Sequence, residues 1–149
     1  MEIQPQIYDN LDQLRYSTFF CYDSPQKNAI GLKLHLNLGE TTDTKEARRV
    51  FDIIQTAFQA WDQSVSKELK GVLFPDQSID QTTPPASGKT TFTASNGFNV
   101  IDVYYVNLKS QTGQDLSIDY ALLSEEIFIS NDPDCLRNAL NYYQDEPGL

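Results

Sequence analysis

The chain has 149 residues, of which 40% are hydrophobic and 11% are aromatic. This is the length of one domain with enough apolar side chains for a core, which excludes a wholly disordered chain. The 21 acidic residues outnumber the 11 basic ones and give a net charge of -10. Such a chain lacks the positive charge with which proteins bind nucleic acids or anionic membranes. We therefore expect a single domain, residues 1–149, with no nucleic-acid and no membrane partner.

The N-terminus and the cysteines predict the compartment. The segment from Met1 to Gln6 has neither the basic nor the apolar part of a secretory leader, which predicts a cytoplasmic protein. In that reducing compartment the only two cysteines, Cys21 and Cys135, are expected to be free thiols. Two cysteines and one histidine are too few for a zinc site, so no metal is predicted.

The first half of the chain predicts a hairpin followed by a helix. Leu14 to Tyr22 is rich in aromatic residues and predicts a strand. Ile30 to Leu38 alternates apolar and polar residues, which is typical of a strand with one buried face. Apolar residues at helical spacing predict one long amphipathic helix from Asp43 to Lys70, packed on the leucine face of the hairpin.

The second half predicts a loop, further strands and a short helix. Residues 75–89 have almost nothing to bury, which predicts a mobile surface loop. A short C-terminal helix is predicted over Asp132–Gln144, with Asp132 as its cap. We expect this helix at an edge of the sheet or beside the long helix. The predicted strands, joined by turns at Asn96-Gly97 and Thr112-Gly113, are Thr90–Ala94, Asn99–Leu108, Leu116–Leu122 and Ile127–Ile129.

These elements together predict an α+β fold. An antiparallel sheet of about five or six strands would pack on one long amphipathic helix, with a short helix at the C-terminus. A fold of this kind is found with many functions, so function has to be argued from the residues.

The sequence offers little support for catalysis or for a bound cofactor. Ser87-Gly88-Lys89-Thr90 imitates the end of a phosphate-binding loop, but a strand is expected after it where that motif needs a helix. With Thr112-Gly113 as a two-residue turn, Asp102 and Asp119 share a face but lie about 13 Å apart, too far for a pair of catalytic carboxylates. His35 lies too far along the hairpin from Cys21 to activate its thiol. We predict no enzyme and no cofactor.

Negative charge gathers in the last quarter of the chain. Residues 111–149 carry eight acidic residues and a single basic one, Arg137, and so account for -7 of the net charge. A charged surface of this kind either keeps a domain in solution or docks a basic protein through electrostatic steering. Tyr142 favours docking, because an aromatic side chain beside carboxylates is a common interface anchor.

The leading hypothesis is therefore a non-enzymatic acidic binding protein that docks a basic protein partner, of the inhibitor, immunity, anti-defence or chaperone type. One alternative is a structural subunit that self-associates through the aromatic residues of Leu14–Tyr22. Another is a small enzyme or small-molecule binder with a pocket near His35, Tyr16 or Asp102. The predicted partner-binding residues are Glu125, Glu126, Asp132, Asp134, Tyr142, Asp145 and Glu146.

Overall fold

The computed structural model of the chain describes residues 5–21, 29–37, 44–61, 64–82 and 84–144. The fold is α+β, as the sequence predicts, with a six-stranded antiparallel sheet. The helices are α1 (Pro5–Tyr8), α2 (Thr44–Trp61), α3 (Val65–Leu73) and α4 (Pro133–Gln144). The strands are β1 (Leu11–Phe20), β2 (Ile30–Leu36), β3 (Ala86–Thr93), β4 (Val100–Lys109), β5 (Asp115–Leu123) and β6 (Glu126–Ser130).

The strand order in the sheet is β1-β2-β6-β5-β4-β3, and every neighbouring pair is antiparallel. The predicted N-terminal hairpin is confirmed as β1–β2, and β3 to β6 form a meander that places β6 beside β2. This order leaves β1 and β3 as the two edge strands.

One face of the sheet packs on α2 and α3. The alternating leucines of β2 point to this face, as predicted, and meet Ile54, Phe58 and Trp61 of α2 in a single core. The Phe58 and Trp61 rings stack, and both meet the ring of Tyr120 edge-on. Burial of these large side chains supplies most of the free energy that holds α2 against the sheet.

The prediction of one helix from Asp43 to Lys70 is wrong in its length. The structure has two helices, α2 ending at Trp61 and α3 beginning at Val65, and Asp43 lies outside the described residues. Ser64 immediately precedes α3, and its short polar side chain disfavours the helix interior. The Trp61 indole donates a hydrogen bond to Glu68, which ties the two helices together across the break.

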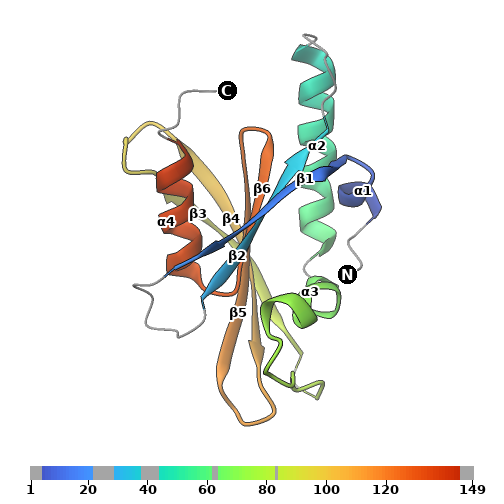
Figure 1. Cartoon of the computed structure of the whole chain (residues 1–149), viewed down its shortest axis with the longest axis vertical. Helices are drawn as coiled ribbons and strands as arrows, with labels where there is room; N and C mark the ends of the chain where they lie inside the picture. The colour runs from blue at the N-terminus through green and yellow to red at the C-terminus, as the bar shows by residue number, and fades with distance from the viewer. Residues whose placement is uncertain (1–4, 22–28, 38–43, 62–63, 83, 145–149) are drawn as a thin grey trace.

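The C-terminal helix α4 lies on the opposite face of the sheet from α2 (Figure 1). The expectation that it would lie at an edge or beside the long helix is therefore wrong. Strands β4 to β6 carry apolar side chains on both faces of the sheet, so the face opposite α2 also has to be covered. Leu136, Ala139 and Leu140 supply that cover by packing on Val103, Ala121 and Phe128.

The register of β4 and β5 also differs from the prediction. Tyr104 faces Tyr120 and Tyr105 faces Asp119, one residue away from the expected pairing. The reason is the turn, which runs from Ser110 to Gln114 and is closed by a hydrogen bond from the Ser110 N–H to the Gln114 carbonyl (2.9 Å). A shift of one residue in register changes which side chains of β4 and β5 lie on the same face of the sheet.

The predicted loop over residues 75–89 is shorter than expected, because β3 begins at Ala86. Before β3, Ile79 is buried and bridges to Ser110, so this stretch is attached to the β4–β5 turn. The residues of β3 that fall within this segment are Ala86, Ser87, Gly88 and Lys89, whose small or polar side chains gave no sign of a strand. The mobility of the remaining residues stays a prediction.

Cys21 and Cys135 form a disulfide, with their Cα atoms 5.5 Å apart, so the prediction of free thiols is wrong. Cys21 follows the last residue of β1, and Cys135 lies in the first turn of α4. The meander brings these two positions together although they are 114 residues apart in sequence, and the sequence spacing gave no sign of this. Among the described helices, none has the length and apolar composition to cross a membrane.

Candidate functional site

Of the predicted partner-binding residues, Asp132 and Asp134 have partners within or next to α4, and two others lie outside the described residues. The side chain of Asp132 is buried, and its carboxylate caps α4 by accepting a hydrogen bond from the Cys135 N–H (2.8 Å). Asp134, in the first turn of α4, is exposed and lies 3.5 Å from Arg137. Asp145 and Glu146 fall outside the described ranges.

The other three predicted residues, Glu125, Glu126 and Tyr142, lie at the same end of the molecule. Tyr142 is 66% exposed in the last turn of α4, and its ring meets that of Tyr143 edge-on. The Lys33 ammonium lies 4.0 Å from the Tyr143 ring centre and 3.2 Å from the Glu126 carboxylate. Glu125 precedes Glu126 in the chain and lies in the β5–β6 turn. Asp134 lies eight residues before Tyr142 in α4, which is about 12 Å along the helix at ~1.5 Å per residue.

Two exposed apolar side chains that the sequence analysis did not select belong to the same end. Phe98, in the turn between β3 and β4, is 90% exposed, and Val100, at the start of β4, is 65% exposed. The Ser95 N–H in this turn donates a hydrogen bond to the Asn141 side chain of α4 (2.9 Å), which places Tyr142 beside the turn. A large aromatic residue directly after Asn96-Gly97 was the available signal, since a tight turn cannot bury it.

We call this end of the molecule the turn end. It consists of the β3–β4 turn, the β5–β6 turn and the last turn of α4, and lies in the upper left and centre of Figure 1, below the top of α2. Its exposed side chains are Phe98, Val100, Glu125 and Tyr142.

A hollow of about 230 Å³ joins the two strand turns. Asn99 and Val100 line one side of it, and Leu123 and Ser124 line the other. The Asp102 carboxylate also lines the hollow and lies 3.7 Å from the Lys89 ammonium. A side chain from a docking partner could enter this hollow, whereas drug-sized ligands occupy pockets of roughly 300–1,000 Å³.

The β5–β6 turn at this end is strained. Ser124 has φ 54°, the one positive φ of a non-glycine residue in the described part of the chain. A two-residue hairpin turn demands this conformation, in which glycine or asparagine is usual. Strained backbone persists where the surrounding structure enforces it, and it is often found at binding sites. Here the Leu36 N–H, which bonds to the Glu125 carbonyl (2.8 Å), helps to hold the turn.

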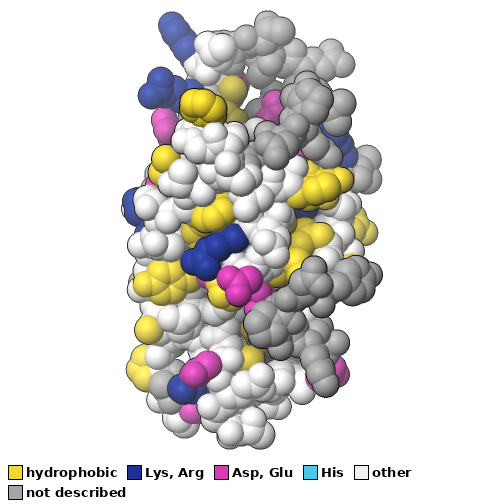
Figure 2. All heavy atoms as spheres, turned by 90° about the vertical axis from the view of Figure 1, so that its left-hand side faces the viewer, with side chains coloured by type: hydrophobic (Ala, Val, Ile, Leu, Met, Phe, Trp, Pro, Cys, Tyr) yellow, Lys and Arg dark blue, Asp and Glu magenta, His cyan; other side chains and the backbone are white. Residues whose placement is uncertain are grey.

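The face that carries α4 is not uniformly acidic. Figure 2 looks onto this face and shows acidic, basic and hydrophobic side chains interspersed among the atoms drawn in colour. The pairing of Asp134 with Arg137 is one cause. The concentration of acidic residues in the last quarter of the sequence therefore does not become one acidic surface over α4.

Asp119 is the described residue with the most perturbed carboxyl group. It is buried under α4, and this burial raises its pKa to about 6, although a hydrogen bond from the Ser117 hydroxyl (2.7 Å) and the charge of Arg137 oppose the shift. The charges of Asp132 and Asp134 raise the pKa further. A raised carboxyl pKa is typical of catalytic acids, but Asp119 lines neither of the hollows described in this section.

Asp102 and Asp119 cannot act as a pair, because the observed register places them on opposite faces of the sheet. Asp102 lies on the α2 side and Asp119 on the α4 side. Within the described ranges, no three His, Cys, Asp or Glu side chains gather in a way that could hold a metal ion.

A second hollow, of about 240 Å³, lies over β1, β2 and β6 and is lined by Tyr16, Lys33, His35 and Glu126, among others. This is where the sequence predicts a small-molecule pocket, but the hollow is smaller than most ligand pockets. His35 Nε2 lies 3.8 Å from the Glu125 carboxylate, so this contact links the hollow to the turn end. The binding of a small molecule here stays a prediction.

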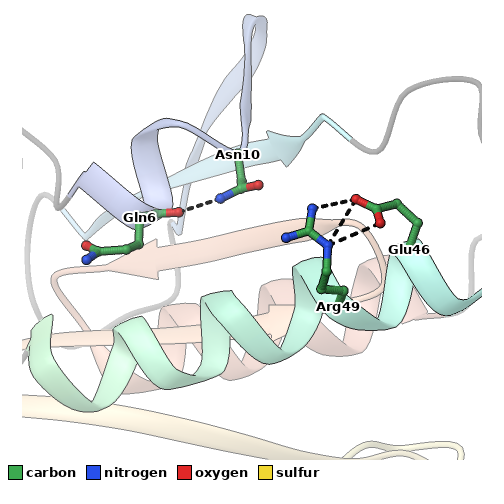
Figure 3. A network of polar contacts seen from close by, with 4 residues as sticks. All are labelled: Gln6, Asn10, Glu46 and Arg49. Atoms are coloured by element: carbon green, nitrogen blue, oxygen red, sulfur yellow. Dashed lines mark hydrogen bonds and ion pairs between the residues drawn. The ribbon is translucent and has the colours of Figure 1, made fainter.

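The polar contacts around α1 and α2 are local (Figure 3). Asn10 donates a hydrogen bond to the Gln6 carbonyl (2.7 Å), and Arg49 donates to both Glu46 carboxylate oxygens (3.1 Å from Nε). The hydrogen bond from Arg49 lowers the pKa of Glu46. Each pair lies within one segment of chain, three or four residues apart, so these contacts stabilise local structure and do not define a site.

No family model, curated protein or solved structure matches this chain. Function therefore has to be inferred from the geometry of the chain itself.

Proposed function

We propose that the chain is a non-enzymatic binding protein that docks a basic surface of another protein at the turn end. The observation that carries the proposal is the presence of three exposed apolar side chains, Phe98, Val100 and Tyr142, at the same end of the sheet as the β5–β6 turn with its exposed Glu125. Inhibitor, immunity, anti-defence and chaperone proteins are the types that this description fits.

The apolar part of the turn end would supply the affinity. Aromatic residues that become fully buried are the usual energetic centres of protein interfaces. Phe98 and Tyr142 come from different elements, and the Ser95–Asn141 hydrogen bond holds those elements together. Since this scaffold is already formed, little conformational entropy would be lost on binding.

The acidic part would supply orientation and speed of association. The whole chain carries a net charge of -10, and Glu125 and Asp102 lie around the hollow or next to it. A cationic side chain that entered the hollow would approach the Asp102 carboxylate. Such a field accelerates the encounter with a basic partner, and salt weakens it.

The predicted cytoplasmic location is also a proposal, and the disulfide counts against it. Reducing systems in the cytosol keep most cysteine pairs reduced, so a stable Cys21–Cys135 disulfide favours an oxidising compartment. Alkylation of the protein in its own cells before lysis would distinguish the two: free thiols support the cytosol, and protected cysteines contradict it.

The proposal is tested by affinity capture with a matched pair of variants. Tyr142→Ala and Tyr16→Ala remove the same side chain from positions that are 66% and 71% exposed, at the turn end and on edge strand β1. We expect Tyr142→Ala to reduce capture of the partner about tenfold or more and Tyr16→Ala to leave it unchanged. Equal capture by both variants would contradict docking at the turn end.

The charge is tested in the same way with Glu125→Gln and Asp115→Asn. Both variants remove one exposed carboxylate, at the turn end and at the opposite end of the sheet. We expect Glu125→Gln to slow association more than Asp115→Asn does, and the difference to disappear at about 0.5 M salt. A captured partner without a basic surface would overturn the electrostatic part of the proposal.

A further inference from the structure

The outer side of edge strand β1 carries backbone groups that are directed away from the sheet. The Cys21 N–H donates a hydrogen bond to the Ala29 carbonyl (3.2 Å), so residue 21 faces β2. Because the direction alternates along a strand, Phe20, Thr18 and Tyr16 direct their N–H and C=O groups outward. Ile30 confirms this alternation, since it lies opposite Phe20 and donates its N–H to Asn131, away from β1.

The side chains of the same three residues are exposed. Tyr16 is 71% and Phe20 is 60% exposed, and Thr18 between them is exposed as well. All three lie on the α2 side of the sheet, because their partners in β2 include Leu32 and Leu34. The helices on that side therefore leave this half of β1 uncovered, although Leu11 at its other end packs against their core. This segment therefore presents aromatic side chains together with outward-directed backbone groups.

Only half of β1 is protected against pairing with another strand. Proteins protect edge strands with charged side chains and irregular pairing. The N-terminal half of β1 has both, with Asp12, Arg15 and a break in register between Leu11 and Tyr16. Residues 16–21 have no charge and pair regularly with β2. The other edge strand, β3, carries Lys89 at its middle.

We propose that a second copy of the chain pairs with β1 through residues 16–20, in an antiparallel register centred on Thr18. Thr18 then lies opposite Thr18 of the second copy, and Tyr16 lies opposite Phe20 at both ends. This is the register in which the outward-directed residues of the two copies face each other. Each such pair exchanges two backbone hydrogen bonds, and the aromatic pairs bury the exposed rings. The two sheets become one continuous sheet across a two-fold axis.

Charge favours a second copy over an unrelated acidic or basic strand. The paired segment is uncharged, so it offers no complementarity to a charged strand, whereas it is complementary to itself in this register. The two copies each carry -10 and repel one another at long range. Added salt screens that repulsion without weakening the apolar contact. Dimerisation should therefore strengthen as salt rises, the opposite of what we expect for the basic partner at the turn end.

Sedimentation equilibrium of the full-length wild type, at low salt and at about 0.5 M salt, is the first test. We expect a monomer–dimer equilibrium that shifts toward dimer at the higher salt concentration. Thr18→Lys places two ammonium groups opposite each other on the two-fold axis and should weaken dimerisation about tenfold or more. Because Thr18 is exposed, the variant should fold normally, which circular dichroism checks.

A mixture of Thr18→Lys with Thr18→Glu tests the register itself. In the proposed register the two substituted side chains face each other, so the mixture should form a heterodimer while each variant alone stays monomeric. A wild type that is monomeric at its highest soluble concentration would overturn the proposal. A dimer that Thr18→Lys does not weaken would also overturn it, as would a mixture that stays monomeric. Tyr142→Ala should leave the dimer intact, which separates this proposal from docking at the turn end.

Discussion

At the scale of single residues, Gly31 makes room for an aromatic ring. Gly31 faces Phe19 across the β1–β2 pair, and a Cβ atom at position 31 would overlap the Phe19 ring. Phe19 in turn packs against Phe128 beneath α4. We expect Gly31→Ala to lower the free energy of unfolding by about 1–3 kcal/mol, because the ring must leave its place. Urea denaturation measures the change.

Gly71 provides the matched control for that substitution. It lies within α3, and a Cβ atom there would meet nothing within 4 Å. Alanine is the better helix former, so Gly71→Ala should raise the free energy of unfolding by roughly 0.5–1 kcal/mol. If both variants changed stability in the same direction, the close packing of Phe19 on Gly31 would be contradicted.

The raised pKa of Asp119 predicts that the stability of the fold depends on pH. Its folded pKa of about 6 lies above the ordinary value of 3.8, so the folded state holds its proton more tightly than the unfolded state. Stability should therefore fall as the pH rises from about 4 to 6, by up to about 3 kcal/mol for this group.

Asp119→Asn tests this prediction, because asparagine can still accept the hydrogen bond from Ser117 and has no charge to bury. The variant should be more stable than wild type at pH 7 and about equal to it near pH 4. The measurement is the difference in urea denaturation between the two proteins across this range. A difference that does not change with pH would show that Asp119 is not the titrating group.

The sequence predicted some residues of the turn end and not others, for physical reasons. Tyr142 was selected as an interface anchor and is exposed, whereas the neighbouring Tyr143 is partly buried against Phe128. Asp132 was selected both as a cap and as a surface acid, and capping buries it. Phe98 was missed because only three-dimensional proximity to α4 shows that the β3–β4 turn belongs to this surface.

At the scale of elements, periodic patterns were predicted well and junctions were not. The alternation in Ile30–Leu36 predicted β2 and its buried face, because alternation follows directly from strand geometry. The junctions depend on local hydrogen bonds. The break after Trp61 and the longer turn from Ser110 to Gln114 each changed an expected length or register. The place of α4 followed from the apolar second face of the sheet, which the sequence showed only for β4.

The disulfide connects two elements covalently, and the stability of the fold should depend strongly on it. It joins the end of β1 to the start of α4 across a sequence separation of 114 residues. Closing a loop of ~100 residues stabilises a fold by about 4–5 kcal/mol in the chain-entropy description. Replacing Cys21 and Cys135 together by alanine should lower the midpoint of urea unfolding substantially, and reduced wild type should behave like the variant. An unchanged midpoint in both would contradict this structural role.

At the scale of the whole molecule, two surfaces of different chemistry lie on separate parts of the sheet. The turn end combines aromatic side chains with carboxylates, whereas the outer side of β1 is aromatic and uncharged over residues 16–20. The two proposals therefore predict opposite responses to salt. A single titration of salt, followed for both partner capture and dimerisation, separates them.

The measurement that tests docking at the turn end most directly is site-specific photo-crosslinking in the cells that make the protein. A photoreactive residue replaces Phe98 at the turn end or, as the control, the exposed Gln111 in the β4–β5 turn at the opposite end of the sheet (Figure 1). We predict that position 98 gives one crosslinked product with a basic protein, that salt reduces its yield in lysate, and that position 111 gives none. The same product from both positions, or none from position 98, would contradict the proposal.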